Sequence, residues 1–170
     1  MTSVDFEPHK AHADSDQNAD QAWLDNVHIV SGTSRRGTDI AAEMQVPLGA
    51  VVNIVLCRVG EQLSVVLMAG DMVCDAAHVS RAFNLDNAPV SRLSEDEIAK
   101  LTGTTIDQLF TIPLAHQWPA VMDASLQRFD ALYTRAGSPR CLIETSYVDL
   151  KALTGAIVSY ALAPTDWRLK

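Results

Sequence analysis

The chain has 170 residues, of which 48% are hydrophobic, and a formal net charge of −8 at pH 7. This length and composition predict one domain with a sizeable core, and no run reaches the ~20 apolar residues that a membrane span needs. A general nucleic-acid binder needs a basic face to displace counterions from phosphates, so the acidic balance argues against a general nucleic-acid binder, and we expect no DNA partner.

The N-terminal segment, residues 1–18, is polar and acidic and is expected to be a disordered tail. His9 and His12 are three residues apart in it. Two histidines in a flexible tail without a third ligand are more often solvated than metal-bound, so we predict no metal site.

The start of the chain lacks the basic and apolar regions of a secretory signal. The cysteines have no CxxC spacing, and two of them lie in apolar runs; they are Cys57, Cys74 and Cys141. We therefore expect reduced thiols and a cytoplasmic protein.

The body of the domain is expected over residues 19–163, with a second tail over residues 164–170. A short helix is predicted over Ala19–Asn26 and a strand over Val27–Val30. Thr38 is a plausible N-cap for a helix over Asp39–Gln45, because Thr caps helices and Pro47 and Gly49 follow.

The loop between that strand and that helix carries Arg35 and Arg36, the densest basic patch of the chain. These arginines are either a solvated surface or phosphate contacts, for which the fork geometry of arginine is suited.

The central stretch consists of two apolar runs, Val51–Cys57 and Leu63–Ala69, joined by a polar segment that contains Gly60. Their length, β-branched content and glycine turn predict a β-hairpin. Asn53 is the one polar residue of the first run. Such a residue is either a core amide bonded to backbone or a strand residue that faces a pocket.

Capping signals continue through the second half of the chain. Asp75 is predicted to cap a helix over Ala76–Phe83, and Ser94 with Glu97 forms a capping box for a helix that stops at Gly103. Residues 104–113 are predicted as a loop. Further strands are expected over 90–93, 131–134, 141–144 and 156–161, a strand and a following turn within 120–126, and a helix over 147–153 capped by Thr145 or Ser146.

These elements, taken in order, resemble the YbaK/EbsC family, also called the prolyl-tRNA synthetase-associated domain. The resemblance rests on P-L-G-A-V-V-N-I-V-L-C-R, on V-V-L-M-A-G-D and on L-S-E-D-E-I-A-K-L-T-G, and it extends from about Val27 to about Ala161. It implies an α/β fold with a central mixed, partly barrel-like sheet surrounded by helices. It places Asn53 where the family usually has a lysine.

The resemblance also implies an activity, hydrolysis of the ester of a mischarged tRNA in trans, with no cofactor. The partners implied are the 3′ end of an aminoacyl-tRNA and an aminoacyl-tRNA synthetase. Asn53 and Gly137 are the implied catalytic residues. The implied substrate-binding residues are Arg35, Arg36, Thr111, Pro113, Arg135, Ala136 and Ser138.

Two departures from the family pattern leave a second interpretation open. Asn53 can donate a hydrogen bond but cannot supply the charge of a lysine, and the loop before Pro113 lacks the family's second glycine. The chain is therefore either a deacylase whose charge comes from an arginine, or a binding or regulatory module that recognises an aminoacyl group, a nucleotide or a protein.

Overall fold

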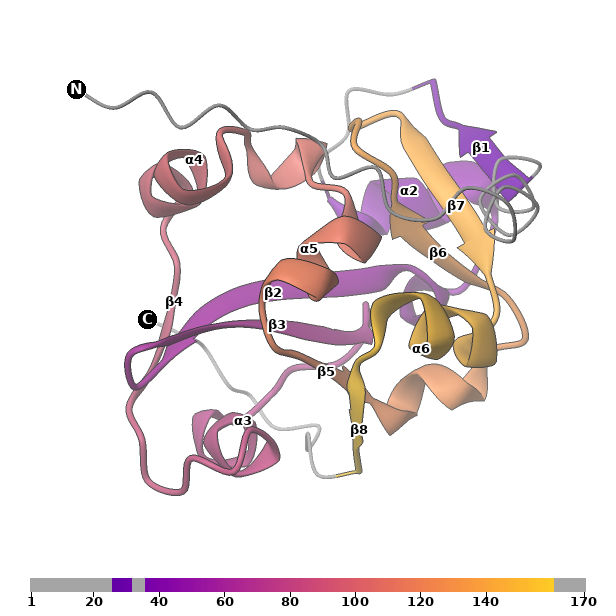
Figure 1. Cartoon of the computed structure of the whole chain (residues 1–170). Helices are drawn as coiled ribbons and strands as arrows, with labels where there is room; N and C mark the ends of the chain where they lie inside the picture. Colours follow the sequence, from indigo (N-terminus) through magenta and orange to yellow (C-terminus); the bar gives the residue numbers. More distant parts are fainter. Residues whose placement is uncertain (1–25, 32–35, 161–170) are drawn as a thin grey trace, which may run out of the picture.

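A computed structural model describes residues 26–31 and 36–160 of the chain (Figure 1). His9, His12, Arg35, both predicted tails and most of the short helix expected over Ala19–Asn26 lie outside the described residues. The described strands are β1 (Val27–Ile29), β2 (Val52–Val59), β3 (Gln62–Ala69), β4 (Val90–Arg92), β5 (Ala120–Asp123), β6 (Leu132–Arg135), β7 (Cys141–Thr145) and β8 (Ile157–Ser159). The described α-helices are α2 (Gly37–Met44), α3 (Ala76–Ala82), α4 (Glu95–Thr102), α5 (Thr111–Gln117) and α6 (Tyr147–Thr154).

The predicted central hairpin is confirmed as β2 and β3. The two strands pair antiparallel from Val52 opposite Ala69 to Val59 opposite Gln62. Gly60 and Glu61 make the turn, and Gly60 has φ +59°, a left-handed value that glycine adopts without strain. The strands run closer to the turn than predicted, because Val59 is fully buried and stays in the ladder.

The hairpin is the centre of a five-stranded mixed sheet in the order β4-β2-β3-β5-β8. Strands β3, β5 and β8 pair in parallel, whereas β4 and β3 flank β2 antiparallel. One face packs against α4, α5 and α6 through Ile98, Leu114 and Leu150. The other face packs against α3 through Val79, and Figure 1 shows α3 across the hairpin from α4 and α5.

A second, three-stranded antiparallel sheet has the order β1-β7-β6. Helix α2 packs against it where Ile40 and Ala41 meet Leu142. A single parallel bridge between Val51 and Tyr133 links the two sheets. The predicted mixed α/β domain is confirmed, and in its described part the strands form two sheets and no closed barrel.

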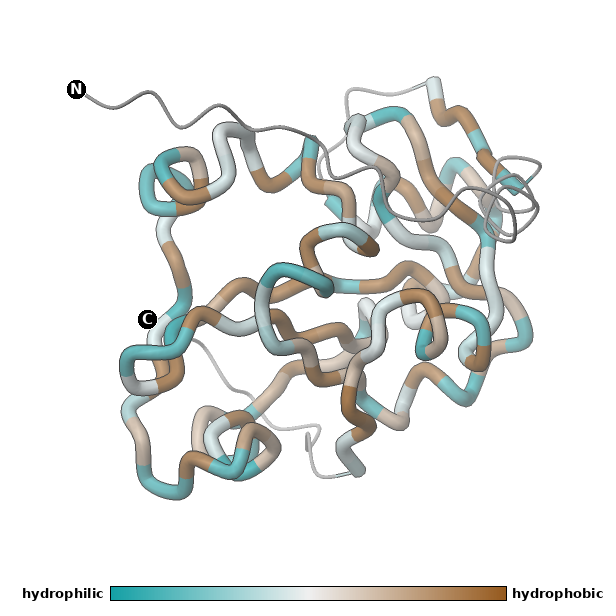
Figure 2. The backbone as a smooth tube through the Cα atoms, in the orientation of Figure 1, coloured by the Kyte–Doolittle hydropathy of each residue, from teal (hydrophilic) through white to brown (hydrophobic). Residues whose placement is uncertain are grey.

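Hydropathy along the chain follows this arrangement. In Figure 2 the hydrophobic segments gather on the central strands, and the hydrophilic ones lie at the β2–β3 turn and on the outer turns of α4. Within the described residues, no helix is both long enough and apolar enough to cross a membrane.

Most of the predicted caps are present. Asp75 accepts a hydrogen bond from the Ala77 amide, the Ser94–Glu97 capping box is complete, and Ser146 caps α6. The N-cap prediction for Thr38 is wrong, because α2 begins two residues earlier, after Arg36, without a side-chain cap.

The predicted loop over residues 104–113 is also wrong in part. It contains a 3-10 turn over Ile106–Gln108, and α5 already begins at Thr111. Pro113 fits there because a proline in the first turn of a helix removes only an amide that has no partner within the helix.

Candidate functional site

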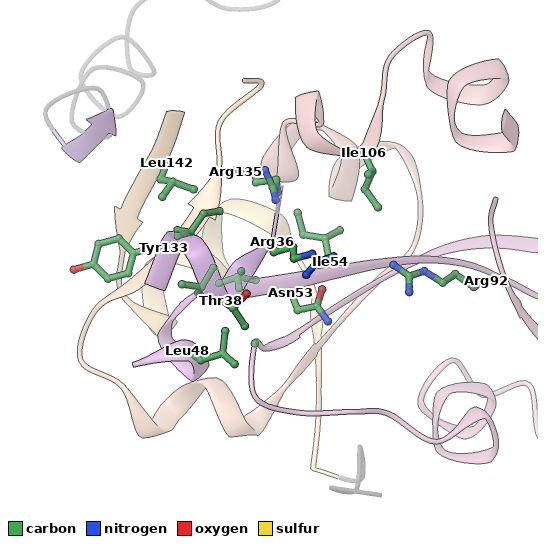
Figure 3. A pocket seen from close by; sticks show the side chains of 15 residues that line it. Arg36, Thr38, Leu48, Asn53, Ile54, Arg92, Ile106, Tyr133, Arg135 and Leu142 are labelled. Atoms are coloured by element: carbon green, nitrogen blue, oxygen red, sulfur yellow. The ribbon is translucent and has the colours of Figure 1, made fainter. Parts of the chain in front are cut away.

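A cavity of about 430 Å³ lies beside the N-terminal half of β2. β4 pairs with β2 over Cys57–Val59, and β6 is joined to the chain before β2 by a single bridge at Val51. Among the described residues, the strand edge between these two pairings is bonded to no other strand and is open in that sense. The described residues that line the cavity there are Arg36, Gly37, Thr38, Ile40, Leu48, Val51, Val52, Asn53, Ile54, Gly70, Arg92, Ile106, Tyr133, Arg135 and Leu142 (Figure 3).

The open edge presents backbone groups to the cavity. The Leu93 amide donates to the Leu56 carbonyl at 2.9 Å, so the backbone of Leu56 faces the β4 side of the strand. Residues two apart in a strand direct their backbone groups to the same edge. The N–H and C=O of Ile54 therefore point away from β3, toward the cavity.

The floor of the cavity depends on a close approach between the end of β3 and the 3-10 turn Leu48–Ala50. A Cβ atom on Gly70 would lie 2.4 Å from the Leu48 carbonyl oxygen and 2.7 Å from that of Val51. The next residue, Asp71, receives two hydrogen bonds from the Arg128 guanidinium, at 2.5 and 3.1 Å. This Gly-Asp pair thus fixes the end of the hairpin, and Asp71 does not line the cavity.

Asn53 lies on the face of β2 that also carries Val55 and Cys57. Val55 and Cys57 are buried, and burial raises the pKa of the Cys57 thiol to about 12. Asn53 is exposed and lines the cavity. Of the two interpretations of this residue, the structure supports a strand residue facing a pocket.

Three arginines line the cavity and give it a positive character. Arg36 precedes α2 and Arg92 ends β4, and both are exposed. Arg135 is partly buried; burial lowers the pKa of its guanidinium, and the nearby Asp107 carboxylate opposes that effect. No carboxylate, histidine, cysteine or lysine is among the described lining residues.

The other predicted site residues within the described part of the chain do not line this cavity. Thr111 is fully buried; its hydroxyl accepts from Thr134 at 2.7 Å and donates to the Arg135 carbonyl at 3.3 Å. The amides of Ala136 and Gly137 donate to Cys141 and Leu109. Pro113 and Ser138, like these three, are absent from the described lining.

The structure therefore brings Asn53, Arg36 and Arg135 together and adds residues that the sequence reading did not select. Arg92, Ile106 and Tyr133 are the clearest of these. Arg92 could not be recognised as a site residue from the sequence, because a strand predicted over residues 90–93 does not show which other strand it pairs with. Its place beside Cys57 follows only from the pairing of β4 with β2.

The described residues contain no group of three or more His, Cys, Asp or Glu side chains that could hold a metal ion. The cavity thus offers the positive charge of three arginines, the side-chain amide of Asn53 and backbone donors. It also offers apolar contacts from Ile54, Ile106 and Leu142. This combination suits an anionic ligand with an apolar portion.

A family comparison matches residues 35–153 to the aminoacyl-tRNA editing domain. The match covers more than half of the chain, and the chain belongs to this family. This confirms the family proposed from the sequence.

No curated protein sequence matches the chain significantly. Among solved structures, a candidate trans-editing enzyme for prolyl tRNA synthetase is 21% identical, with a TM-score of 0.68 over 87% of this chain and 97% of that one. A hypothetical protein is 20% identical, with a TM-score of 0.70 over 84% and 97%. A protein from work on grafting linear epitopes onto scaffolds is 22% identical, with a TM-score of 0.68 over 82% and 91%. At these identities the likeness shows the fold.

Proposed function

We propose that the protein is an aminoacyl-tRNA deacylase that acts in trans on mischarged tRNA. The observation that carries the proposal is the arginine-lined cavity at the open edge of β2, within the region that matches the editing-domain family. The similarity to a candidate trans-editing enzyme for prolyl tRNA synthetase agrees with this reaction, and a synthetase is a plausible further partner.

The proposed reaction needs no cofactor. Water adds to the ester carbonyl, with the neighbouring ribose hydroxyl close enough to hydrogen-bond to it, and the bond between that carbon and the terminal ribose oxygen then breaks. Addition of water places the amino acid and the free tRNA in solution, and the proton lost by the water restores the ribose hydroxyl. The step that the protein must assist is the development of negative charge on the carbonyl oxygen.

The residues suited to this role are those that line the cavity. The Ile54 amide at the open edge is a backbone donor for the carbonyl oxygen, Asn53 positions the substrate beside it, and Arg135 orients the aminoacyl end. Arg36 meets the RNA backbone, with Arg35 beside it in sequence. Thr111, Pro113, Ala136, Gly137 and Ser138 support the wall that carries Arg135, since the Ala136 and Gly137 amides are already bonded.

One observation favours the second function left open by the sequence. No side chain that could act as a general base is among the described lining residues, and general acid–base groups are common in hydrolases. A non-catalytic module that binds an aminoacyl nucleotide would use the same cavity without needing such a group.

The test is incubation of the protein with a panel of tRNAs, each mischarged with a different amino acid, and measurement of ester loss over time. A deacylase cleaves at least one of them faster than the spontaneous rate, and Arg36→Glu slows that cleavage. An absence of cleavage across the panel, with binding retained, would leave the binding module as the function.

A further inference from the structure

Arg92 is not among the site residues that the family resemblance implies. It is the last residue of β4 and lies directly opposite Cys57 of β2. Opposed residues of an antiparallel pair project to the same face of a sheet, so Arg92 shares a face with Cys57, Val55 and Asn53. Its positive charge lowers the pKa of the Cys74 thiol, a minor effect beside burial but one that places it on this face.

The Arg92 side chain extends toward Asn53. Cys57 and Asn53 are four positions apart, which is roughly 13 Å along a strand. Figure 3 shows the Arg92 guanidinium directed along β2 toward the Asn53 amide. The two side chains border the same cavity.

The Arg92 charge is not neutralised by any described residue. Arg128 is held by Asp71 and Arg58 lies 3.8 Å from Glu97, whereas Arg92 forms no ion pair or side-chain hydrogen bond within residues 26–31 and 36–160. Arg135, by contrast, lies in the field of the buried Asp107. Arg92 is therefore available to a ligand.

We propose that Arg92, with the Asn53 amide, holds a backbone phosphate of the RNA 3′ end, and is a substrate-positioning residue of this site. The identity of the ligand rests on the proposed function; the anion-binding role rests on the geometry. A guanidinium and a side-chain amide both donate hydrogen bonds to phosphate oxygens. The phosphate would lie across the open edge of β2, which places the terminal ribose near Ile54.

The test measures binding separately from hydrolysis. The probe is a short single-stranded RNA ending in CCA, with an amino acid joined to its 3′ end through an uncleavable amide. Its dissociation constant is measured at several salt concentrations for the wild type, Arg92→Ala, Arg92→Lys and Arg81→Ala. Arg81 is an exposed arginine of α3 outside the described cavity lining, so it controls for net charge.

We expect Arg92→Ala to weaken binding by about ten- to one-hundredfold, as for loss of a charged hydrogen bond. The slope of log K against log salt should become shallower by about 0.7, the value for one phosphate contact on a single strand. Arg92→Lys should keep the slope, and Arg81→Ala should match the wild type. Thermal unfolding confirms that each variant is folded.

Moving the charge gives a second, independent test. Asn53→Lys in the Arg92→Ala background should restore the salt slope and most of the affinity, because it returns a cation to the same face. In the wild-type background Asn53→Lys should have little effect. Equal gains in both backgrounds would show that the two positions do not serve one phosphate and would overturn the proposal.

The outcomes separate this inference from the proposed function. An unchanged salt slope in Arg92→Ala, or no binding of the probe by the wild type, overturns the role of Arg92. If the salt slope of Arg92→Ala is shallower as expected but the wild type cleaves no mischarged tRNA, the deacylase proposal fails and the phosphate site stands. If wild type and Arg92→Ala cleave equally well, deacylation stands and the Arg92 site fails.

Discussion

The two halves of β2 share one strand and differ in what covers them. From Leu56, whose carbonyl accepts from the Leu93 amide, to Val59 the strand is joined to the β4 segment and its side chains are packed; Cys57 is 1% exposed and Val59 is fully buried. Over the preceding residues β4 is absent, and Asn53, on the same face as Cys57, is exposed beside a cavity. The site therefore lies where pairing with β4 ends.

This difference separates two kinds of substitution. A change in the covered half removes buried contacts and costs stability. The Asn53 side chain of the open half is exposed and has no partner to lose within the described structure, so a change there should affect ligand binding instead. Each prediction below tests whether one residue is held by buried contacts or faces the ligand.

Leu56→Ala tests the covered half and should have the largest effect. Leu56 is 1% exposed and belongs to the main core cluster, and its carbonyl accepts a hydrogen bond from the Leu93 amide. Truncation of a buried leucine costs about 2–5 kcal/mol, through lost transfer free energy and the cavity left behind. Chemical denaturation would measure the loss; a cost below about 1 kcal/mol would contradict the packed state of this half.

Gly70→Ala tests the floor of the open half. An added Cβ would meet the backbone oxygens of Leu48 and Val51 inside 3.0 Å, and backbone cannot rotate away as a side chain can. Overpacking typically costs 1–3 kcal/mol, and we expect about 3 kcal/mol here by thermal unfolding. Gly37→Ala is the matched control, because its nearest neighbour would be an ordinary 3.6 Å contact; a similar loss in both would refute the tight approach.

Thr111→Val tests whether a predicted site residue is structural. The substitution keeps the shape but leaves the buried Thr134 hydroxyl without its 2.7 Å acceptor. We expect a loss of about 1–2 kcal/mol in the free energy of unfolding, with unchanged binding of the amide-linked RNA probe. Thr111→Ser keeps the hydroxyl and should recover most of the stability; a loss of binding without a loss of stability would return Thr111 to the site.

The sequence was sufficient for elements defined by local chemistry. The hairpin, the Ser94–Glu97 capping box and the helix end at Gly103 depend on residues within a few positions of each other, and all three are present. The start of α2 was missed because Thr38 matches a cap by residue type, although the chain is already helical at Gly37.

The lining residues that could be predicted were those with a local sequence signal or a place in the family resemblance, such as Asn53, Arg36 and Arg135. Asn53 was identifiable as a lone polar residue in an apolar run. Arg92 and Tyr133 were not, because each reaches the cavity through a pairing between distant segments, β4 with β2 and the Val51–Tyr133 bridge. The resemblance implied Gly137 as a catalytic residue, and the bond of its amide to the Leu109 carbonyl is a fact that only the fold reveals.

Asn53→Ala should have the smallest effect on stability and still impair the site. Asn53 is exposed, and its side chain forms no hydrogen bond with any described residue, so the change in unfolding free energy should stay within about 0.5 kcal/mol. Loss of the Asn53 side-chain amide would nonetheless weaken binding of the amide-linked RNA probe. The salt slope would stay as in the wild type, because it depends on the number of cationic side chains that contact phosphates. That pattern distinguishes a neutral donor beside Arg92 from a surface residue with no ligand. Unchanged affinity would show that the amide does not contact the RNA, and a large loss of stability would show that Asn53 belongs to the covered half of the strand.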